Sequence, residues 1–214
     1  MNKEQNDEYI VVTSVKNPDR VEKRRAQIIA AAVQIFSEKG YHDTTTKEIA
    51  ERAGMNVGTM FQYVQNKQDI LYLVCVHIHG MIEEALFSLQ KDDKLDPFES
   101  LAKDVSALIK VVDQLSDYVL IMYQETASLE KAARRSFLQR EQRLSNHLEK
   151  QIKNGVDAGI FNISKDAVPL LAEDILVQAQ MWAFRRWSLS TKYTIDTYIT
   201  TRIKLLQDIL ISPH

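Results

Sequence analysis

Residues 45–67 constrain the fold more than any other stretch, because they predict two short helices joined by a tight turn. Thr45 and Glu48 have the spacing of a capping box, which marks the start of a helix. Gly54 suits the left-handed backbone conformation that ends a helix, because it has no Cβ. Asn56 is placed to cap a second helix directly afterwards.

Each of these two helices carries one apolar face at helical spacing. In the first helix the face consists of Ile49, Ala50 and Ala53. In the second, the stripe predicted to be buried consists of Val57, Met60, Phe61 and Val64, and Thr59, Gln62 and Tyr63 point elsewhere. Such a helix pair, with a Gly-containing turn of about 3–4 residues, is the geometry that places a second helix in the major groove of DNA. The spacing is also compatible with a plain helical hairpin in an all-α core.

The residues of this stretch resemble the DNA-binding signature of the TetR family of bacterial transcriptional regulators. The matching positions are Thr45, Ile49-Ala50, Ala53-Gly54, Asn56, Gly58-Thr59-Met60-Phe61, Tyr63 and Lys67. Upstream, Arg24-Arg25, Ile28 to Phe36 and Gly40-Tyr41 are similar to the family's first helix and the turn after it. Phe61 stands where the family usually has Tyr, and Val64 where it usually has Phe.

Composition favours an all-α fold. The 214 residues include only six Gly and four Pro, and long segments show helical rather than alternating apolar patterns. We expect about nine helices: 18–39, two within 45–67, then 67–89, 97–115, 116–129, 131–158, 165–189 and 195–211. The expected organisation is a flexible arm over 1–17, a three-helix DNA-binding domain with the helix-turn-helix over 18–66, and a helical ligand-binding and dimerisation domain over 67–214.

The distribution of charge agrees with that organisation. The whole chain has a formal net charge of −2, but residues 16–68 contain nine Lys or Arg and six Asp or Glu. A basic segment on an acidic body suits a DNA-reading domain attached to a sensing domain.

A cytoplasmic protein without a membrane partner is expected. The chain opens with a polar, acidic segment rather than a signal peptide, and no apolar run approaches the roughly 18–20 residues that span a bilayer. The single cysteine, Cys75, lies in an apolar run, so we expect a buried, inert thiol.

The resemblance assigns DNA contacts residue by residue. It implies that Thr45, Lys67 and Tyr63 contact the phosphate backbone, for which hydroxyl and ammonium groups are suited. Gln62 is the candidate for a base-edge hydrogen bond, because an amide pairs bidentately with adenine. The further candidates on or near the second helix are Asn56, Val57, Gly58 and Thr59, and those on the first are Thr46 and Lys47. Arg24 and Arg25 either reach phosphates or belong to a solvated helix face.

The rest of the sequence shows no catalytic constellation, so no enzyme activity, cofactor or metal is expected. There is no Gly-rich phosphate loop and no paired carboxylate that stands out. His77 and His79 are two apart and point away from each other on a helix, and His147 is isolated, whereas a metal site needs convergent ligands.

A TetR-like body implies an effector cavity and a homodimer through the helices at 164–189 and 194–211. The candidate ligand-binding residues are His79, Met122, Tyr123, Trp182, Arg185 and Arg186. The two arginines lie in an aromatic run, so they belong either to a solvated helix edge or to an anion-binding pocket mouth.

The nature of the effector and the role of the chain stay open at this point. The segment from Met181 to Ile199, together with residues 17–25 and 77–86, is similar to a family branch that controls acyl-CoA and fatty-acid metabolism. That similarity favours an acyl-CoA effector, with hydrophobic cations or other apolar compounds as the alternative. Repression at a palindromic operator is the family's usual mode, and a DNA-organising or cell-division role without a ligand switch is the alternative function.

Overall fold

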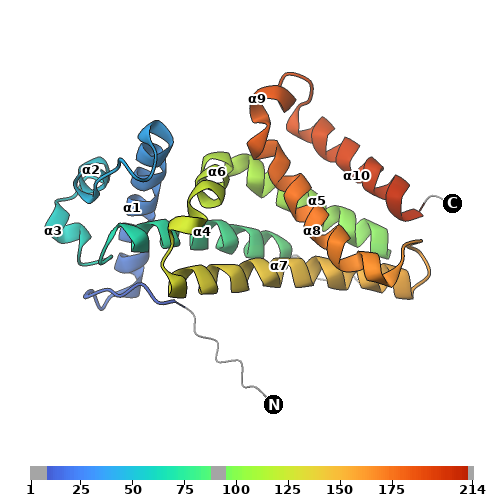
Figure 1. Ribbon diagram of the computed structural model, residues 1–214, viewed down its shortest axis with the longest axis horizontal. Helices are drawn as coiled ribbons and strands as arrows, with labels where there is room; N and C mark the ends of the chain where they lie inside the picture. The colour runs from blue at the N-terminus through green and yellow to red at the C-terminus, as the bar shows by residue number, and fades with distance from the viewer. Residues whose placement is uncertain (1–8, 88–94, 212–214) are drawn as a thin grey trace, which may run out of the picture. The chain divides into compact units, whose positions relative to one another are not determined.

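The computed structural model describes residues 9–87 and 95–211, which contain ten α-helices, two short 3-10 helices and no strand (Figure 1). The all-α prediction is therefore confirmed. The α-helices are α1 (Pro18–Lys39), α2 (Thr46–Arg52), α3 (Val57–Met60), α4 (Lys67–Phe87), α5 (Pro97–Gln114), α6 (Ser116–Glu125), α7 (Lys131–Asp157), α8 (Val168–Phe184), α9 (Arg186–Leu189) and α10 (Ile195–Ile211). The 3-10 helices are η1 (Thr126–Ser128) and η2 (Lys165–Ala167).

The predicted helix boundaries follow from residues that satisfy free backbone groups at helix ends. The Thr45 hydroxyl accepts from the Glu48 N–H at 3.3 Å, and the Glu48 carboxylate accepts from the Thr45 N–H at 2.8 Å, which completes the capping box. Gly54 and Gly159 adopt left-handed φ values of +69° and +70° just past α2 and α7. A side chain at either position would strain that backbone.

Three helix predictions were wrong in extent. The second helix of the pair is a single turn that ends at Met60. The segment predicted as one helix to 189 breaks at Arg185, whose φ of −119° and ψ of 19° are not helical, and this break adds α9 as a tenth helix. The helix predicted to end at 129 ends at Glu125 and continues as η1. The predicted last residues of the helix at 67–89 lie outside the described residues.

The chain forms two compact units. Unit 1 consists of residues up to Ile78 together with Leu120–Gln139, and it contains α1, α2, α3 and the first part of α4. Its core is built from apolar faces at helical spacing. The fully buried side chains include Ile28, Ile49, Met60, Ile70 and Leu71. Burial of each such side chain contributes about 1.5–3 kcal/mol, so this core holds the short helices α2 and α3 in place.

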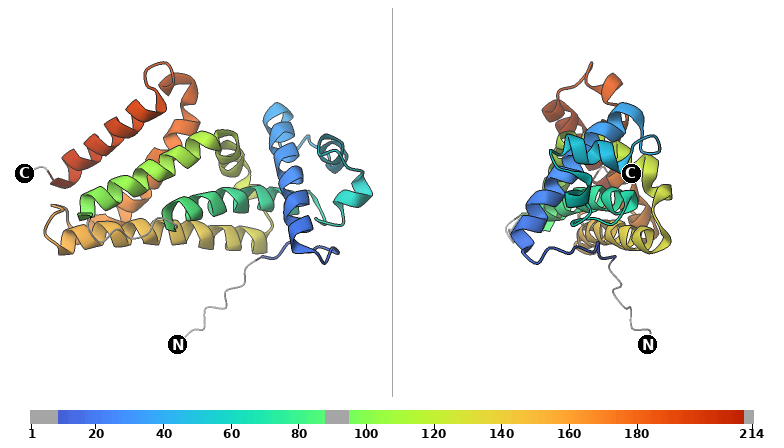
Figure 2. Two further views of the ribbon diagram at one scale, coloured as in Figure 1. Left: turned by 180° about the vertical axis from the view of Figure 1, so that it is seen from behind. Right: turned by 90° about the vertical axis from the view of Figure 1, so that its left-hand side faces the viewer.

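Unit 2 consists of His79–Val119 and Arg140–His214, in which α5 packs against both α8 and α10 (Figure 2). Its core includes Leu101, Leu108, Leu144, Leu148 and Ile152, each no more than 1% exposed. Cys75, which belongs to unit 1, is buried as expected.

Helix α4 corrects the statement that no apolar run is long enough to span a bilayer. Its 21 residues, Lys67–Phe87, are long and apolar enough by length and composition, and half of the most apolar window is buried inside the protein. Core helices of soluble proteins have the same properties, so the helix is weak support for membrane insertion.

Residues 9–15, which belong to the expected flexible arm over 1–17, make contacts with the rest of unit 1. Val11 is 5% exposed, the Tyr9 hydroxyl donates to the Asp69 carboxylate at 2.7 Å, and the Ser14 N–H donates to the Gln62 carbonyl at 3.0 Å. Residues 1–8 lie outside the described residues, and the predicted three-domain division remains a prediction.

Candidate functional site

The candidate recognition element is α3 together with the turn that follows it. Asn56 caps α3, because its side-chain oxygen accepts from the Thr59 N–H at 2.7 Å. Met60 and Val64 are fully buried, as predicted. The predictions for Phe61 and Tyr63 were wrong. Phe61, predicted to be buried, is 43% exposed, whereas Tyr63, predicted to point away from the core, is fully buried. The helix ends at Met60, so the 3.6-residue period on which the prediction relied does not continue through these two residues.

The burial of Tyr63 removes it from the candidate DNA contacts. Its hydroxyl has no hydrogen-bond partner among the residues that the structure describes. A side chain without accessible surface does not reach a phosphate, so this prediction is corrected.

Several other candidates are accessible on α2, α3 and the following turn. Lys47, Gly58 and Gln62 are exposed, and Thr46, Val57 and Thr59 are half-buried. The Lys47 ammonium lies 4.0 Å from the Glu51 carboxylate, one helical turn away, and its side chain is 76% exposed. An ion pair this open contributes little, so the Lys47 ammonium is available for another anion.

Thr45 and Asn56 are exposed, but their side chains already act as helix caps. The Thr45 hydroxyl donates to Glu48 Oε2 at 2.8 Å and also accepts from the Glu48 N–H. Glu48 is held further by Lys39, whose ammonium lies 2.6 Å from Glu48 Oε1. These bonds, the one from Lys39 first, lower the pKa of the Glu48 carboxyl to about 2. The geometry gives both residues a role in ordering α2 and α3.

Lys67 has a structural role in the protein, and its predicted phosphate contact stays a prediction. Its ammonium donates to the carbonyls of Tyr41, His42 and Thr44 at 2.9, 3.1 and 2.7 Å, and it lies 4.4 Å from the centre of the Tyr41 ring. An ammonium has three donors, and all three are used. Burial lowers the pKa of Lys67. The side chain therefore ties the start of α4 to the turn between α1 and α2.

Arg25 likewise has a structural role, whereas Arg24 is available. The Arg25 guanidinium donates to the Tyr63 carbonyl at 3.1 and 3.0 Å and to the Val11 carbonyl at 2.7 Å. Among the described residues, Arg24 bonds only its neighbour Gln27, at 2.9 Å on an exposed face. The two alternatives predicted for this pair were a phosphate contact and a solvated helix face. Arg24 is free to contact phosphate, whereas the hydrogen bonds of Arg25 fit neither alternative.

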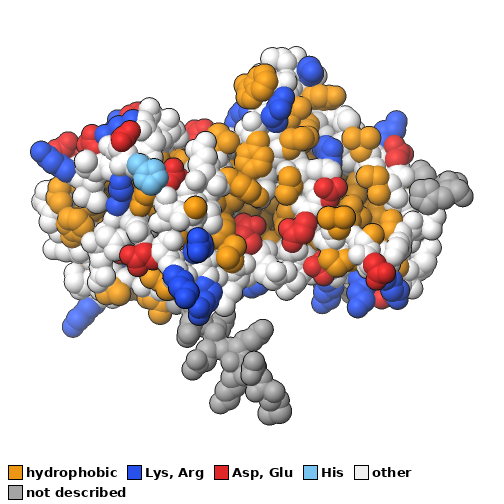
Figure 3. Space-filling model, in the orientation of Figure 1, with side chains coloured by type: hydrophobic (Ala, Val, Ile, Leu, Met, Phe, Trp, Pro, Cys, Tyr) orange, Lys and Arg blue, Asp and Glu red, His pale blue; other side chains and the backbone are white. Residues whose placement is uncertain are grey.

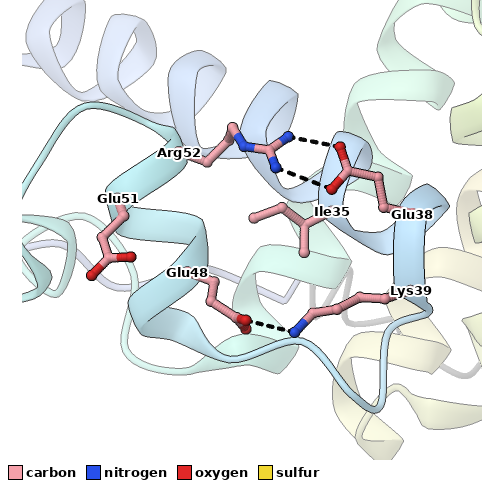
Figure 4. A pocket seen from close by; sticks show the side chains of 6 residues that line it. All are labelled: Ile35, Glu38, Lys39, Glu48, Glu51 and Arg52. Atoms are coloured by element: carbon pink, nitrogen blue, oxygen red, sulfur yellow. Dashed lines mark hydrogen bonds and ion pairs between the residues drawn. The ribbon is translucent and has the colours of Figure 1, made fainter.

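A surface groove of about 490 Å³ lies between α1 and α2 (Figure 4). Its sides are joined by two ion pairs, Lys39 with Glu48 and Arg52 with Glu38, and Ile35 lies between them. Arg52 meets Glu38 through two nitrogens at 2.9 and 3.0 Å, and this bidentate bond lowers the pKa of the Glu38 carboxyl. Both cations of the groove are used in these ion pairs, and Glu51 adds a further negative charge to its lining. Among the described residues that line it, the groove therefore offers no free cation for an anionic ligand, and its ion pairs join α1 to α2.

In unit 2, Arg186 lies beside an acidic residue that the sequence analysis did not single out. Its guanidinium is 3.4 Å from the Asp113 carboxylate and donates to the Ser116 hydroxyl at 2.9 Å. The buried Trp182 donates its indole N–H to the same carboxylate at 2.7 Å. The sequence did not indicate Asp113 as the ion-pair partner of Arg186, because Asp113 lies on α5, 73 residues earlier.

Arg185 faces solvent instead. Its guanidinium lies 4.9 Å from the centre of the Trp187 ring, and Trp187 is 72% exposed. Of the two alternatives for the arginine pair, the solvated edge describes Arg185. Arg186, whose side chain is 51% exposed, is paired and still partly accessible.

The remaining ligand candidates divide between the two units. His79, in unit 2, is fully buried, and its Nε2 lies 2.6 Å from the Glu141 carboxylate. Met122 and Tyr123 belong to unit 1, where Met122 is buried and Tyr123 is 46% exposed. Within the described residues, no group of three or more His, Cys, Asp or Glu is placed to hold a metal ion.

A small pocket of about 20 Å³ lies within unit 2 between α5, α8 and α10. It is lined by apolar side chains, including Val105, Ile109 and Leu206, with Gln178 and Arg202 among them. This volume is near that of one water molecule, so an effector of any size would have to displace side chains there.

The chain matches two protein-family models. Residues 28–72 match the model described as bacterial regulatory proteins, tetR family, and residues 94–185 match that of a tetracyclin repressor-like C-terminal domain. The HTH-type transcriptional regulator HbdR of Aromatoleum sp. (strain CIB) is 32% identical over 196 residues, which is 92% of this chain and 84% of that relative.

Solved structures share the fold. A tetR-family regulatory protein from Rhodococcus RHA1 superposes with a TM-score of 0.80 at 21% identity, over 90% of this chain and 99% of that one. AibR, in complex with isovaleryl coenzyme A and operator DNA, superposes with a TM-score of 0.73 at 21% identity, over 85% and 97%.

Proposed function

The chain belongs to the tetR family of bacterial regulatory proteins, and on that premise we propose that it is a repressor that a small effector releases from a palindromic operator. Like its relatives, it is a DNA-binding transcriptional regulator, and it is not an enzyme. A cytoplasmic location is part of the proposal, since operators lie there.

The observation that carries the DNA-reading role is the exposed row on α2, α3 and the turn after them. Lys47, Gly58 and Gln62 are exposed there, and the caps and the core of unit 1 fix the backbone that bears them. A preorganised backbone loses less entropy on binding. Gln62 has donor and acceptor groups for a base edge, and Lys47 offers a charge for phosphate.

Selection of binding sites from random DNA by the purified protein tests this role. We expect a palindromic sequence with half-sites about one helical turn, or a multiple of it, apart. Gln62→Ala should relax base preference at one position, whereas Lys47→Met should weaken binding to all sequences and reduce the salt dependence. Absence of any enriched sequence would contradict the proposal, and dense occupancy along the genome would favour the DNA-organising alternative.

A homodimer through α8 and α10 is supported by apolar side chains left exposed on these helices. Figure 3 shows hydrophobic side chains at several places on the face of unit 2 that it displays. Leu170 is 73%, Val177 50%, Leu205 46% and Ile209 49% exposed. Exposed apolar groups of this kind are typical of interaction surfaces, and one helix-turn-helix per subunit needs a partner to read two half-sites.

Light scattering after size-exclusion chromatography tests the dimer. We expect a dimer at micromolar concentration and a shift towards monomer for Val177→Glu, because the substitution would place a carboxylate in the interface. Glu173→Gln, on the same helix, is the control, because the amide keeps an oxygen that accepts from the Ser145 hydroxyl. A monomeric wild-type protein would overturn the proposed interface.

An acyl-CoA is the proposed effector class. It is supported by the partly exposed Arg186, which shares the Asp113 carboxylate with the Trp182 indole, and by AibR, whose structure holds isovaleryl coenzyme A and operator DNA. Ligand and DNA affinities are linked, so an acyl-CoA releases DNA only if it binds the DNA-incompetent arrangement more tightly. The acyl tail should supply most of the binding free energy, so free CoA should not release DNA.

A gel-shift titration with acyl-CoAs from short branched to long chains tests the effector class. Arg186→Ala should weaken the response without unfolding the protein, and Lys192→Ala, exposed in the following loop, is the matched control. Release by none of the acyl-CoAs at tens of micromolar would contradict this class and favour hydrophobic cations or other apolar compounds, while leaving the regulator assignment intact.

A further inference from the structure

Residues Tyr9–Val15, here called the N-terminal strap, cross unit 1 in an extended, non-helical course before α1 begins. Tyr9, Val11 and Thr13 turn towards the protein, and Ile10 and Val12 turn away, with 77% and 54% of their surface exposed. This alternation of inward and outward residues is that of an extended chain docked along one side.

The strap ends on the carbonyl of Gln62, the predicted base-reading residue. Three donors converge on that one oxygen: the Thr13 hydroxyl at 2.8 Å, the Ser14 N–H at 3.0 Å and the Ser14 hydroxyl at 3.4 Å. The Thr13 hydroxyl in turn accepts from the Val15 N–H at 3.2 Å. The backbone of Gln62 is thus held from the strap, while its side chain stays exposed.

Arg25 extends this hold to the next residue. Its guanidinium connects the Tyr63 carbonyl to the Val11 carbonyl of the strap, so α1, the strap and the turn after α3 share one set of hydrogen bonds. Hydrogen bonds from a charged group are stronger than neutral ones. The turn has no continuing helix to order it, because α3 ends at Met60.

The other end of the strap is attached to α4. The Tyr9 hydroxyl donates to Asp69 Oδ1 at 2.7 Å, and the Tyr9 and Tyr72 rings meet edge to face at 4.9 Å between centroids. Asp69 is 2% exposed, and its other oxygen accepts from the Gln65 N–H at 2.7 Å. Burial, together with the bond to Asp69, raises the pKa of Tyr9.

We propose that the N-terminal strap positions Gln62 for base reading, with Thr13 and Tyr9 as positioning residues. This inference rests on the proposed DNA-binding function. Base readout depends on the position of Gln62, whereas contacts to phosphate depend mainly on charge. Release of the strap should therefore lower the affinity for the operator more than the affinity for random DNA.

Thr13→Val tests the inference, because it keeps the shape of the side chain and removes the hydroxyl. Probes are the palindrome selected by the intact protein and a random duplex of the same length. We expect about a 3- to 10-fold loss of affinity for the palindrome, less than a 2-fold loss for random DNA and an unchanged salt dependence. Tyr9→Phe should act in the same direction, because it breaks the bond to Asp69.

Two further variants separate positioning from folding. Thr13→Ser keeps the hydroxyl and should restore the affinity, and Val12→Thr, at an outward strap position, should change nothing. Hydrogen exchange at the amides of residues 62–64 should accelerate in Thr13→Val, with the melting temperature within about 2 °C of that of the intact protein. Unchanged discrimination between palindrome and random duplex in Thr13→Val would overturn the inference. If the intact protein selects no sequence, the DNA-binding proposal itself fails.

Discussion

Replacement of Lys67 by Met should destabilise the fold rather than remove a DNA contact. Met keeps an unbranched apolar side chain and removes the ammonium, so three carbonyls each lose one donor. The Tyr41 carbonyl still accepts from the Thr44 N–H at 3.2 Å. A hydrogen bond from a charged group contributes about 1.5–3 kcal/mol. Water can rehydrate part of this turn, where His42 is exposed while Tyr41 and Thr44 are buried. We therefore expect a total loss of about 2–4 kcal/mol.

That loss corresponds to a melting temperature lower by roughly 5–15 °C for a chain of this size. Circular dichroism during heating measures the shift, and hydrogen exchange at Thr44 reports whether the turn opens first. The matched control is Lys47→Met, because within the described part of the chain the Lys47 ammonium has only the open pair with Glu51. It should melt within about 1–2 °C of the wild type and should weaken DNA binding.

Measuring both melting and DNA binding for Lys67→Met and Lys47→Met separates a structural lysine from one that contacts phosphate. If Lys67→Met melted like the wild type but lost affinity for every duplex, Lys67 would be a phosphate contact. The three carbonyl bonds would then contribute nothing measurable to stability.

Three other outcomes follow from single side chains. Tyr63→Phe removes a buried hydroxyl that has no partner among the described residues, so it should keep DNA affinity unchanged and raise the unfolding free energy by up to about 1 kcal/mol; weaker DNA binding would restore Tyr63 as a contact. Gly155→Ala should lower the unfolding free energy by roughly 1–3 kcal/mol, because its Cβ would overlap the Phe161 ring. Chemical denaturation measures this loss, and a more stable variant would show that the ring can shift. The pKa of Glu48 lies near 2 against an ordinary 4.5, so the stability that its bonds provide is complete above about pH 4.5 and lost as the pH falls towards 2. A carboxyl titration by NMR with a midpoint above pH 4 would contradict this.

Local signals in the sequence were sufficient for much of the fold. The capping box at Thr45, the cap at Asn56 and the left-handed Gly54 and Gly159 each depend on neighbours within a few residues, and the structure contains all of them. Bonds of this kind are encoded in a short window of sequence.

Contacts between distant segments were not predictable in the same way. Lys67 and Arg25 carry charges of the sign that DNA attracts, yet their donors are used by carbonyls 23–26 and 14–38 residues away. A family motif fixes the residue type at such a position but not the number of its donors that the fold consumes. The strap was missed because its apolar alternation is only a few residues long.

The carboxylate of Asp113 has a consequence for any anion that approaches Arg186. Because the arginine already has a counter-ion, an incoming anion must replace the Asp113 carboxylate. The binding free energy is then the difference between the free energies of the two ion pairs. Asp113→Asn would retain an acceptor for the Trp182 indole while removing the competing charge. If the effector binds at Arg186 as proposed, Asp113 would set the effector concentration needed for the response without touching the effector.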